Sequence, residues 1–275
     1  MAELPKSTVV VPLYIYPLDS ETWAPLYAAQ VMNGRKRKKT SGNTQRNRQQ
    51  SKDPIINDNT TSIESNPELE FLRPWRFPLP DANYAREVPR LNGYPNVYTV
   101  GYIRIDYCKK PHSEAFAEIE QYAGWSAQYD STKLGVRGIF VDETPNHYSL
   151  DRADYLRELT KFIKNTPGIL ADRFVIHNPG TPPDVVISES ADMFFISEEP
   201  YPRYRSDEVQ KWLGRFKYDR NRSGVMINEV PLEDLETLVH ELRHKAAYIF
   251  VTEIAGDFYE RFGPRSWEAL MQALQ

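Results

Sequence analysis

Short apolar runs alternate with amphipathic stretches along most of the chain, and the alternation becomes regular from residue 97 onward. Runs rich in Val, Ile and Phe that are bounded by Gly, Pro or acidic residues are typical of buried strands. Seven such runs occur, at residues 9–16, 97–104, 138–143, 173–178, 193–198, 224–229 and 247–252. Between them, apolar side chains recur at helical spacing. The helices predicted in this way lie around residues 23–32, 84–91, 116–123, 155–163, 209–216, 235–242 and 267–274.

Strands that alternate with helices predict a parallel sheet in an α/β fold. The seven runs fall one short of a (β/α)8 barrel of the TIM type. The interval between residues 16 and 97 is long enough for the missing second strand, and Glu68–Leu72 is the best candidate in it. We therefore predict a (β/α)8 barrel whose second strand is degenerate or missing. An open doubly wound sheet is the competing architecture.

The whole chain, residues 1–275, is expected to form this single barrel domain. A basic segment at about 34–66 interrupts the pattern, because Lys and Arg dominate residues 35–52 and no apolar periodicity is present. This composition is typical of a disordered or irregular surface insertion. The alternative is a nucleic-acid site or nuclear signal. The run lacks aromatic residues for base stacking, and the formal net charge is −4, so no nucleic-acid partner is expected.

Composition narrows the class of protein further. Hydrophobic residues make up 40% of the chain, which is enough for a substantial core. The single cysteine, Cys108, cannot form a disulfide within the chain. No nucleotide-binding glycine motif appears, and no cofactor is predicted. The first residues lack the pattern of a signal peptide, and no apolar run is long enough to span a membrane. The expectation is therefore no membrane association and, by default, a cytoplasmic location.

Polar side chains follow several of the predicted strands at their carboxyl ends. These groups are Asp142-Glu143, His177-Asn178, Glu198-Glu199, Asn228-Glu229 and Thr252-Glu253. In α/β barrels this end of the strands carries the ligand site. We expect these groups to share one rim of the barrel. The alternative is that each of them caps the helix that follows.

The stretch around Asp142 carries the most specific signal. Asp142 and Glu143 end an apolar run, and Pro145 then stops the strand. Because neighbouring residues on a strand point to opposite faces, one acid is expected to be catalytic and the other to support it. The partner acid must come from another strand, and Glu198 is the best candidate. Two carboxylates across a cleft are what glycoside hydrolysis requires, since one protonates the leaving oxygen and the other attacks the anomeric carbon or activates water.

The segment His240–His244 matches the H-E-x-x-H pattern of zinc proteases. At helical spacing, the Leu and Val residues between 235 and 242 form one apolar face, and both histidines fall on the opposite face. A zinc-binding helix would turn its histidines toward a cleft, whereas these are expected to face solvent. Glu260 is a candidate third ligand. A zinc hydrolase is therefore kept as a minor hypothesis, and no metal site is predicted.

A set of short motifs covers the first strand and nearly everything after residue 80. They are Val11–Pro17, Pro95–Val97 with Gly101-Tyr102, Tyr122–Trp125, Gly138–Pro145, Asn178–Gly180, Ala191-Asp192 with Glu198, and Thr252 with Tyr259. In these motifs the chain resembles the spherulin 4-type family (spherulation-specific family 4), which is glycoside hydrolase family 135-like. The family's second strand ends in a loop similar to Asn-Pro-x-Ser-Gly-Pro-Gly, and the chain has no counterpart of that loop.

The resemblance implies a (β/α)8 barrel and endo-type cleavage of α-1,4-linked N-acetylgalactosamine in a galactosaminogalactan-like polysaccharide. It implies Asp142 as nucleophile or transition-state stabiliser, Glu198 as general acid/base and Glu143 as a positioning group. The weaker candidates for sugar contacts are Tyr14, Tyr16, Tyr102, Asn178 and Trp125. Core packing is the other interpretation of Trp125. The alternative function is a non-catalytic carbohydrate-binding, cell-surface or spore-wall protein, and many relatives are secreted or surface-attached.

Overall fold

Parallel strands close into a barrel at the centre of the molecule. The computed structural model describes residues 5–29, 68–72 and 82–275, so the basic insertion expected at about 34–66 lies outside the described residues. The strands pair in sequence order and β8 pairs with β1, which leaves no open edge. The strands are β1 (Thr8–Leu13), β2 (Glu68–Leu72), β3 (Val97–Arg104), β4 (Gly138–Asp142), β5 (Phe174–Asn178), β6 (Met193–Pro200), β7 (Ser223–Asn228) and β8 (Tyr248–Val251).

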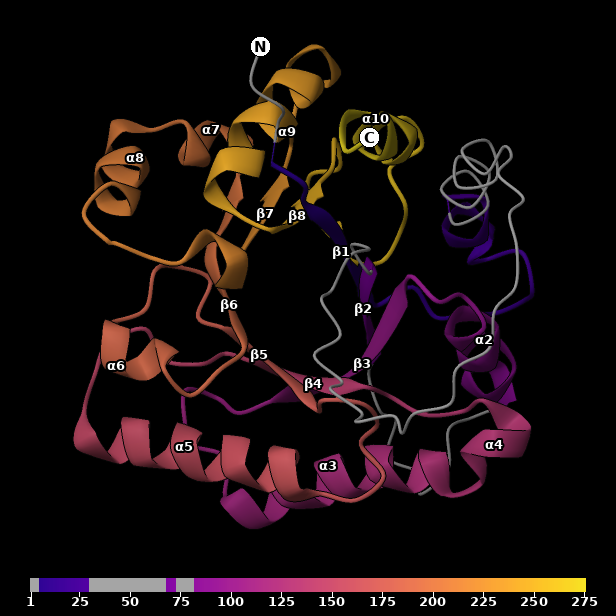
Figure 1. The fold of residues 1–275 in the computed structure, drawn as a ribbon. Coiled ribbons are helices and arrows are strands. Elements are labelled where there is room, and N and C mark those ends of the chain that lie inside the picture. The colour runs from indigo at the N-terminus through magenta and orange to yellow at the C-terminus, as the bar shows by residue number, and fades with distance from the viewer. Residues whose placement is uncertain (1–4, 30–67, 73–81) are drawn as a thin grey trace, which may run out of the picture.

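Helices surround the strands (Figure 1). The α-helices with described bounds are α2 (Ala82–Asn92), α3 (His112–Trp125), α4 (Tyr129–Thr132), α5 (Leu150–Asn165), α6 (Val185–Ser188), α7 (Tyr201–Tyr204), α8 (Asp207–Leu213), α9 (Leu232–Lys245) and α10 (Ser266–Ala273). Residues 24–29 are also helical, and short 3₁₀ turns occupy Ser126–Gln128 and Arg220–Arg222. In the described ranges, no helix is both long enough and apolar enough to cross a bilayer.

The second strand completes the barrel. Glu68–Leu72 forms β2 and pairs in parallel with both neighbours, so that Leu69 lies opposite Val10 of β1 and Tyr98 of β3. The prediction of a (β/α)8 barrel is confirmed, and of the two possibilities for the second strand, degenerate or missing, the second is excluded because the candidate Glu68–Leu72 forms it. The open doubly wound alternative was also wrong, because β1 and β8 are paired.

Strand β3 packs closely against α3 because Gly101 has no side chain. A Cβ at Gly101 would lie 2.7 Å from the ring of Tyr122. The hydroxyl of Tyr122, a fully buried residue of α3, accepts a hydrogen bond from the Tyr102 N–H at 2.9 Å and donates one to the Tyr102 carbonyl at 3.1 Å. The backbone of Tyr102 is thus fixed from the helix layer, and its side chain reaches Asp142 at the end of β4.

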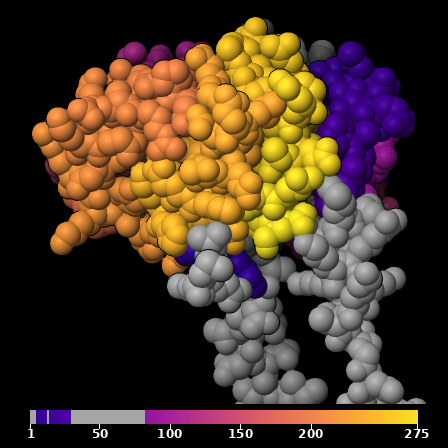
Figure 2. All heavy atoms as spheres, turned by 90° about the horizontal axis from the view of Figure 1, so that it is seen from above, coloured from indigo at the N-terminus to yellow at the C-terminus, as the bar shows by residue number. Residues whose placement is uncertain are grey.

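The first and last described segments meet on α9. Buried Arg243 donates from Nε to the Pro5 carbonyl at 2.8 Å and from Nη1 to the Ala273 carbonyl at 3.1 Å. Trp267 of α10 donates to the Pro25 carbonyl at 3.2 Å. On the surface, the N-terminal segment (indigo) accordingly lies beside the C-terminal segment (yellow) in Figure 2. These contacts hold the β8–β1 seam of the barrel closed.

Candidate active site

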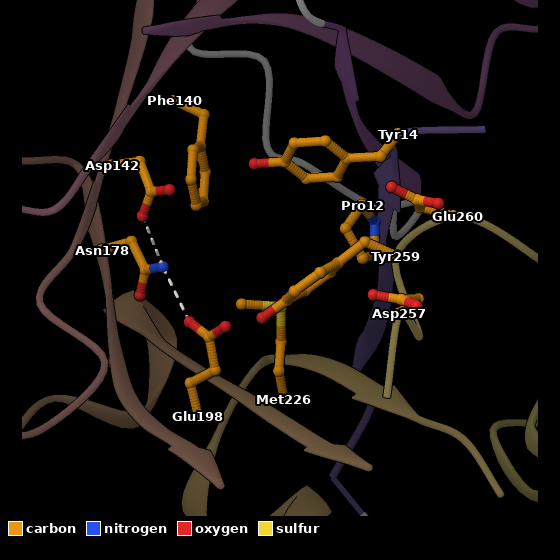
Figure 3. Close-up of a pocket in the computed structure, with 10 residues that line it drawn as sticks. All are labelled: Pro12, Tyr14, Phe140, Asp142, Asn178, Glu198, Met226, Asp257, Tyr259 and Glu260. Atoms are coloured by element: carbon orange, nitrogen blue, oxygen red, sulfur yellow. Dashed lines mark hydrogen bonds between the residues drawn. The ribbon is translucent and has the colours of Figure 1, made fainter. Parts of the chain in front are cut away.

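One pocket opens at the carboxyl ends of the strands, where the sequence predicted a shared site. Side chains from β1, β4, β5, β6, β7 and the segment after β8 converge on it (Figure 3). Ten described residues line it, namely Pro12, Tyr14, Phe140, Asp142, Asn178, Glu198, Met226, Asp257, Tyr259 and Glu260. Four of the predicted site residues, Tyr14, Asp142, Asn178 and Glu198, are therefore brought together.

Asp142 is the last residue of β4, and its carboxylate accepts three hydrogen bonds. Oδ2 accepts from the Tyr102 hydroxyl at 2.6 Å, and Oδ1 accepts from the Glu143 backbone N–H at 2.8 Å. The third donor is Nδ2 of Asn178, at 2.9 Å from Oδ1. Burial, together with the adjacent Asp142 charge, raises the pKa of Tyr102 far above its usual range, so this hydroxyl stays protonated and donates. These donors hold the Asp142 carboxylate in one orientation toward the pocket.

Asn178 connects the two acids. Its Nδ2 also donates to Oε2 of Glu198 at 2.8 Å, and its Oδ1 accepts from the Gly180 N–H at 3.1 Å. One amide nitrogen thus bridges the carboxylates of Asp142 and Glu198 (Figure 3). The two acceptor oxygens can be no farther apart than the combined length of these two hydrogen bonds. The bridged oxygens of the two carboxylates therefore lie less than about 6 Å apart.

Strand register explains how the bridge forms. Asp142 of β4 and Asn178 of β5 are direct partners in the parallel ladder, so their side chains emerge side by side. On β6 the register shifts between Phe195 and Ser197, which places Glu198 opposite Met226 of β7. This irregularity sets which residues of β6 face the pocket. Glu198 and Met226 both line it as a result.

The environment of Glu198 favours a proton on its carboxyl. Burial raises the pKa of Glu198 to about 7, and the nearby charges of Asp142 and Glu199 act in the same direction. The hydrogen bond from Asn178 opposes this shift. A carboxyl that keeps its proton up to a pH of about 7 is suited to general acid catalysis.

The side chain of Glu143 contacts Arg104 and not the pocket. The residue follows the end of β4 with a φ of 52°, and its Oε2 lies 2.7 Å from Nε of Arg104 at the end of β3. It does not line the pocket. Its backbone N–H is the group that contacts Asp142. A positioning role for Glu143, rather than a reacting one, stays a prediction that this geometry favours.

Aromatic rings form the wall across from the two acids. The rings of Tyr14 and Tyr259 lie 5.3 Å apart between centroids, tilted by 52°. Tyr14 also packs edge-on against Tyr102, at 5.4 Å. Tyr102 does not line the pocket directly but links this wall to Asp142. Hydroxyl-bearing rings of this kind offer a sugar both an apolar face and hydrogen bonds.

Two further predicted sugar contacts, Tyr16 and Trp125, also lie outside the pocket. The Tyr16 ring packs edge-on against Tyr84 at 5.6 Å, and its hydroxyl accepts from Asn83 at 2.9 Å. Trp125 is buried at the carboxyl end of α3, where it packs against Tyr122 at 5.0 Å. That end of the helix leads toward the start of β4 and not toward the pocket. Core packing therefore accounts for Trp125, and neither residue is proposed further as a sugar contact.

Sequence reasoning did not single out several residues of the pocket wall. Phe140 and Met226 were treated only as strand residues, although period-2 alternation from Asp142 and Asn228 places both on the inner face. Asp257 received no role, and Glu260 was considered only as a zinc ligand. Both lie in the segment after β8, which has no periodicity that predicts its course. The occurrence of acids beside Tyr259 was the one available signal.

In the H-E-x-x-H segment of α9, His240 and Glu241 are half-buried, whereas Leu242 and Arg243 are buried. The predicted apolar face is confirmed, because Leu235, Leu238, Val239 and Leu242 are all buried. Glu241 accepts hydrogen bonds from Arg205, at 2.5 Å, and from Lys245, at 2.7 Å. His244 is exposed. Within the described ranges, no three His, Cys, Asp or Glu side chains are grouped so as to hold a metal ion. The contacts of Glu241 are those of a structural ion-pair cluster.

Comparisons with known proteins show the family and the fold of the chain. The sequence matches the family model described as spherulation-specific family 4 over residues 60–274. The crystal structure of Aspergillus clavatus Sph3 in complex with GalNAc superposes with a TM-score of 0.82, at 32% sequence identity and over 98% of both chains. No curated protein matches the chain.

Two further solved structures are less similar. An endo-beta-N-acetylglucosaminidase from Cordyceps militaris in apo form gives a TM-score of 0.46 at 12% identity, over 75% of this chain and 80% of that one. The GH18 chitinase ChiB of Flavobacterium johnsoniae gives 0.49 at 8% identity, over 76% and 86%. These likenesses are too slight to carry an argument.

The closed barrel and its match to Sph3 define a carbohydrate-active, glycoside hydrolase-like fold. Within that class, the chain belongs to the spherulation-specific family 4.

Proposed function

We propose that this protein is an endo-acting glycoside hydrolase that cleaves α-1,4-linked N-acetylgalactosamine in a galactosaminogalactan-like polysaccharide. The observation that carries the proposal is the amide of Asn178, which holds the carboxylates of Asp142 and Glu198 against one pocket. The similarity to Sph3, whose structure contains GalNAc, supports the choice of sugar. The family resemblance supplies the linkage and the endo-type action.

The two acids take different roles because their surroundings differ. Glu198, with its raised pKa, protonates the glycosidic oxygen as the bond to the anomeric carbon breaks. Asp142, held by three donors, attacks the anomeric carbon or stabilises its positive charge from the other side. Glu198, now ionised, then takes a proton from the incoming water. The short separation of the two carboxylates favours retention of the anomeric configuration over inversion, which requires ~6.5–9.5 Å.

The experiment is an incubation of the full chain with purified galactosaminogalactan and with defined α-1,4-linked N-acetylgalactosamine oligomers. Released reducing ends and product masses measure cleavage. The wild type should release internal fragments, and Asp142→Asn and Glu198→Gln should each lose at least ~10²-fold in kcat. Glu120→Gln, which removes an exposed acid from α3, is the matched control and should retain wild-type activity.

The alternative is a non-catalytic carbohydrate-binding protein. Binding of the same oligomers by the wild type without any release of reducing ends would support that alternative and reject the hydrolase. Cleavage at equal rates by the wild type and both acid variants would reject the assignment of Asp142 and Glu198. Loss of cleavage on addition of EDTA, restored by zinc, would revive the metal hypothesis.

A further inference from the structure

The two oxygens of the Asp142 carboxylate are held differently. Oδ1 accepts two hydrogen bonds, from the Glu143 N–H at 2.8 Å and from Nδ2 of Asn178 at 2.9 Å. Among the described residues, Oδ2 accepts one, from the Tyr102 hydroxyl at 2.6 Å. Each carboxylate oxygen has two lone pairs, so Oδ1 has none left for a new bond and Oδ2 has one. The oxygen that Asn178 does not contact points into the pocket (Figure 3). Oδ2 is therefore the atom placed to attack a sugar.

The Tyr102 hydroxyl is fixed beside this oxygen. Its ring is buried, stacks on Phe140 at 5.8 Å between centroids and meets Tyr14 edge-on at 5.4 Å. Its backbone is held on both sides by the hydroxyl of Tyr122. Burial, with the adjacent Asp142 charge, keeps the pKa of Tyr102 far above its usual range, so the group stays a donor. The hydroxyl therefore keeps its place next to Oδ2 throughout the reaction.

The charge on Oδ2 changes along the proposed reaction. In the first step a lone pair of Oδ2 forms a bond to the anomeric carbon, the bond from that carbon to the leaving sugar breaks, and Glu198 gives its proton to the leaving oxygen. In the second step water adds to the anomeric carbon and gives a proton to Glu198, while the electron pair of the carbon–Oδ2 bond returns to Asp142. Oδ2 thus belongs to a carboxylate before and after the two steps and to a neutral ester between them.

The hydrogen bond from Tyr102 follows this change in charge. A hydroxyl donates roughly twice as strongly to a carboxylate as to a neutral oxygen. Tyr102 therefore stabilises the free carboxylate relative to the ester. In the second step Asp142 is the leaving group, and its charge reappears in the transition state directly beside this donor. In the first step the same donor holds back the attack of Oδ2. The geometry thus favours release of the sugar from Asp142 over its capture.

We infer that Tyr102 is a positioning residue that acts through Oδ2 of Asp142 and accelerates hydrolysis of the covalent glycosyl-enzyme intermediate. The inference rests on the proposed hydrolase function, with Asp142 as the nucleophile. It assigns the attacking oxygen, and it identifies a hydroxyl outside the pocket lining on which the second step depends.

The test separates the two steps in the variant Tyr102→Phe, which keeps the ring and the backbone contacts with Tyr122. The substrate is a nitrophenyl glycoside of an α-1,4-linked N-acetylgalactosamine oligomer, and stopped-flow absorbance follows the released nitrophenol. A burst of about one equivalent per enzyme reports the first step, and the steady rate that follows reports the second.

The steady rate of Tyr102→Phe should fall about tenfold to a hundredfold, the range expected for one hydrogen bond to a charged group. The rate constant of the burst should change by less than about threefold, and kcat and KM should fall together because the intermediate accumulates. Intact-protein mass spectrometry of the quenched reaction should show the enzyme with the sugar attached.

Tyr98→Phe is the matched control. Tyr98 lies near the other end of the same strand, β3, and its hydroxyl donates to Asp172 at 2.5 Å. The substitution thus removes an equivalent tyrosine–aspartate hydrogen bond away from the pocket. This variant should keep the wild-type kcat and KM.

The outcomes separate this inference from the proposed function. A wild type that leaves both the nitrophenyl glycoside and the polymer intact would reject the hydrolase itself. If the wild type cleaves, a Tyr102→Phe variant with an unchanged steady rate would overturn the inference alone. So would a fall in kcat at constant KM without a burst, since the hydroxyl would then serve only to hold the site together.

Discussion

At the scale of single residues, the proposed chemistry depends on Asn178, whose side-chain amide forms hydrogen bonds with both acids. Its Nδ2 donates to Asp142 and Glu198, while its Oδ1 is fixed by the Gly180 N–H. The same residue keeps the acids close and limits the rise in the pKa of Glu198. The pH dependence of activity should therefore follow the pKa of Glu198, and substitution of Asn178 should shift it.

The pH dependence should follow Glu198. Since the pKa of its carboxyl is about 7 and the protonated form is the general acid, kcat/KM should fall as pH rises through about 7. Above that pH the decline should approach about tenfold per pH unit. The measurement is a pH profile of initial cleavage rates. A profile that stays flat from pH 6 to 9, an interval of about three units around this pKa, would contradict the role of Glu198.

Substitution of Asn178 should change both rate and profile. Asn178→Ala removes the hydrogen bond that lowers the pKa of Glu198, so the alkaline limb of the profile should move to higher pH. The loss of the bridge should also reduce kcat by ~10²-fold, the usual cost of one donor in a catalytic site. A loss of rate with an unmoved limb would assign Asn178 to substrate binding alone.

The two acids of the site could be predicted from their positions at strand ends, whereas the hydrogen bonds that connect them through Asn178 could not. Asp142 and Glu198 follow apolar runs, and their placement at one rim follows from parallel strands. The bridge by Asn178 depends on the register shift in β6 between Phe195 and Ser197, and no periodicity in the sequence indicates it. Asp257 lies in a segment without periodicity, which is why it could not be assigned.

At the scale of elements, the helix layer supports the site through one buried contact. Tyr122 of α3 packs over Gly101 and exchanges two hydrogen bonds with the backbone of Tyr102. The Tyr102 hydroxyl in turn donates to Asp142. A side chain in the outer layer thereby orients a carboxylate inside the barrel.

Removal of that hydroxyl should affect stability and catalysis together. Tyr122→Phe keeps the ring over Gly101 but leaves the backbone N–H of Tyr102 without its partner, which should lower the free energy of unfolding by about 1–3 kcal/mol. Activity should fall by less than in Asp142→Asn, because Asp142 keeps its other donors. Urea denaturation measures the first effect and initial rates the second. Unchanged stability would contradict the structural role of this hydroxyl.

Most helices and strands were predictable, because the spacing of apolar residues in each segment and the length of that segment indicate the same element type. The strand predicted at 97–104 coincides with β3, and the helix expected at 235–242 lies within α9. Strand β2 was the difficult case, since Glu68–Leu72 is short and stands apart from the regular alternation that begins at residue 97. Barrel closure, a property of all the strands together, is what identifies it.

At the scale of the whole molecule, the buried acid lowers stability in exchange for reactivity. The folded-state pKa of Glu198 is raised, so the unfolded chain releases this proton more readily than the folded chain does. Ionisation therefore favours unfolding. The resulting loss of stability develops as pH rises from about 4.5 to about 7 and persists above that interval.

Neutralisation of this group should therefore stabilise the protein at alkaline pH. Glu198→Gln should raise the free energy of unfolding by about 2 kcal/mol at a pH about one unit above 7, and should change it little below about 4.5. Thermal unfolding of the two proteins at both pH values measures the difference. A variant that is less stable than the wild type on the alkaline side would contradict the burial argument.

The close approach of Asp142 and Glu198 is the central claim, and the stereochemistry of cleavage tests it most directly. Proton NMR can follow the anomeric signals of the first products released from an α-1,4-linked N-acetylgalactosamine oligomer. A carboxylate pair whose bridged oxygens lie less than about 6 Å apart predicts that the α-anomer appears first and the β-anomer only later, by mutarotation. Initial release of the β-anomer would contradict the account, because inversion requires room for a water molecule between the sugar and the second acid.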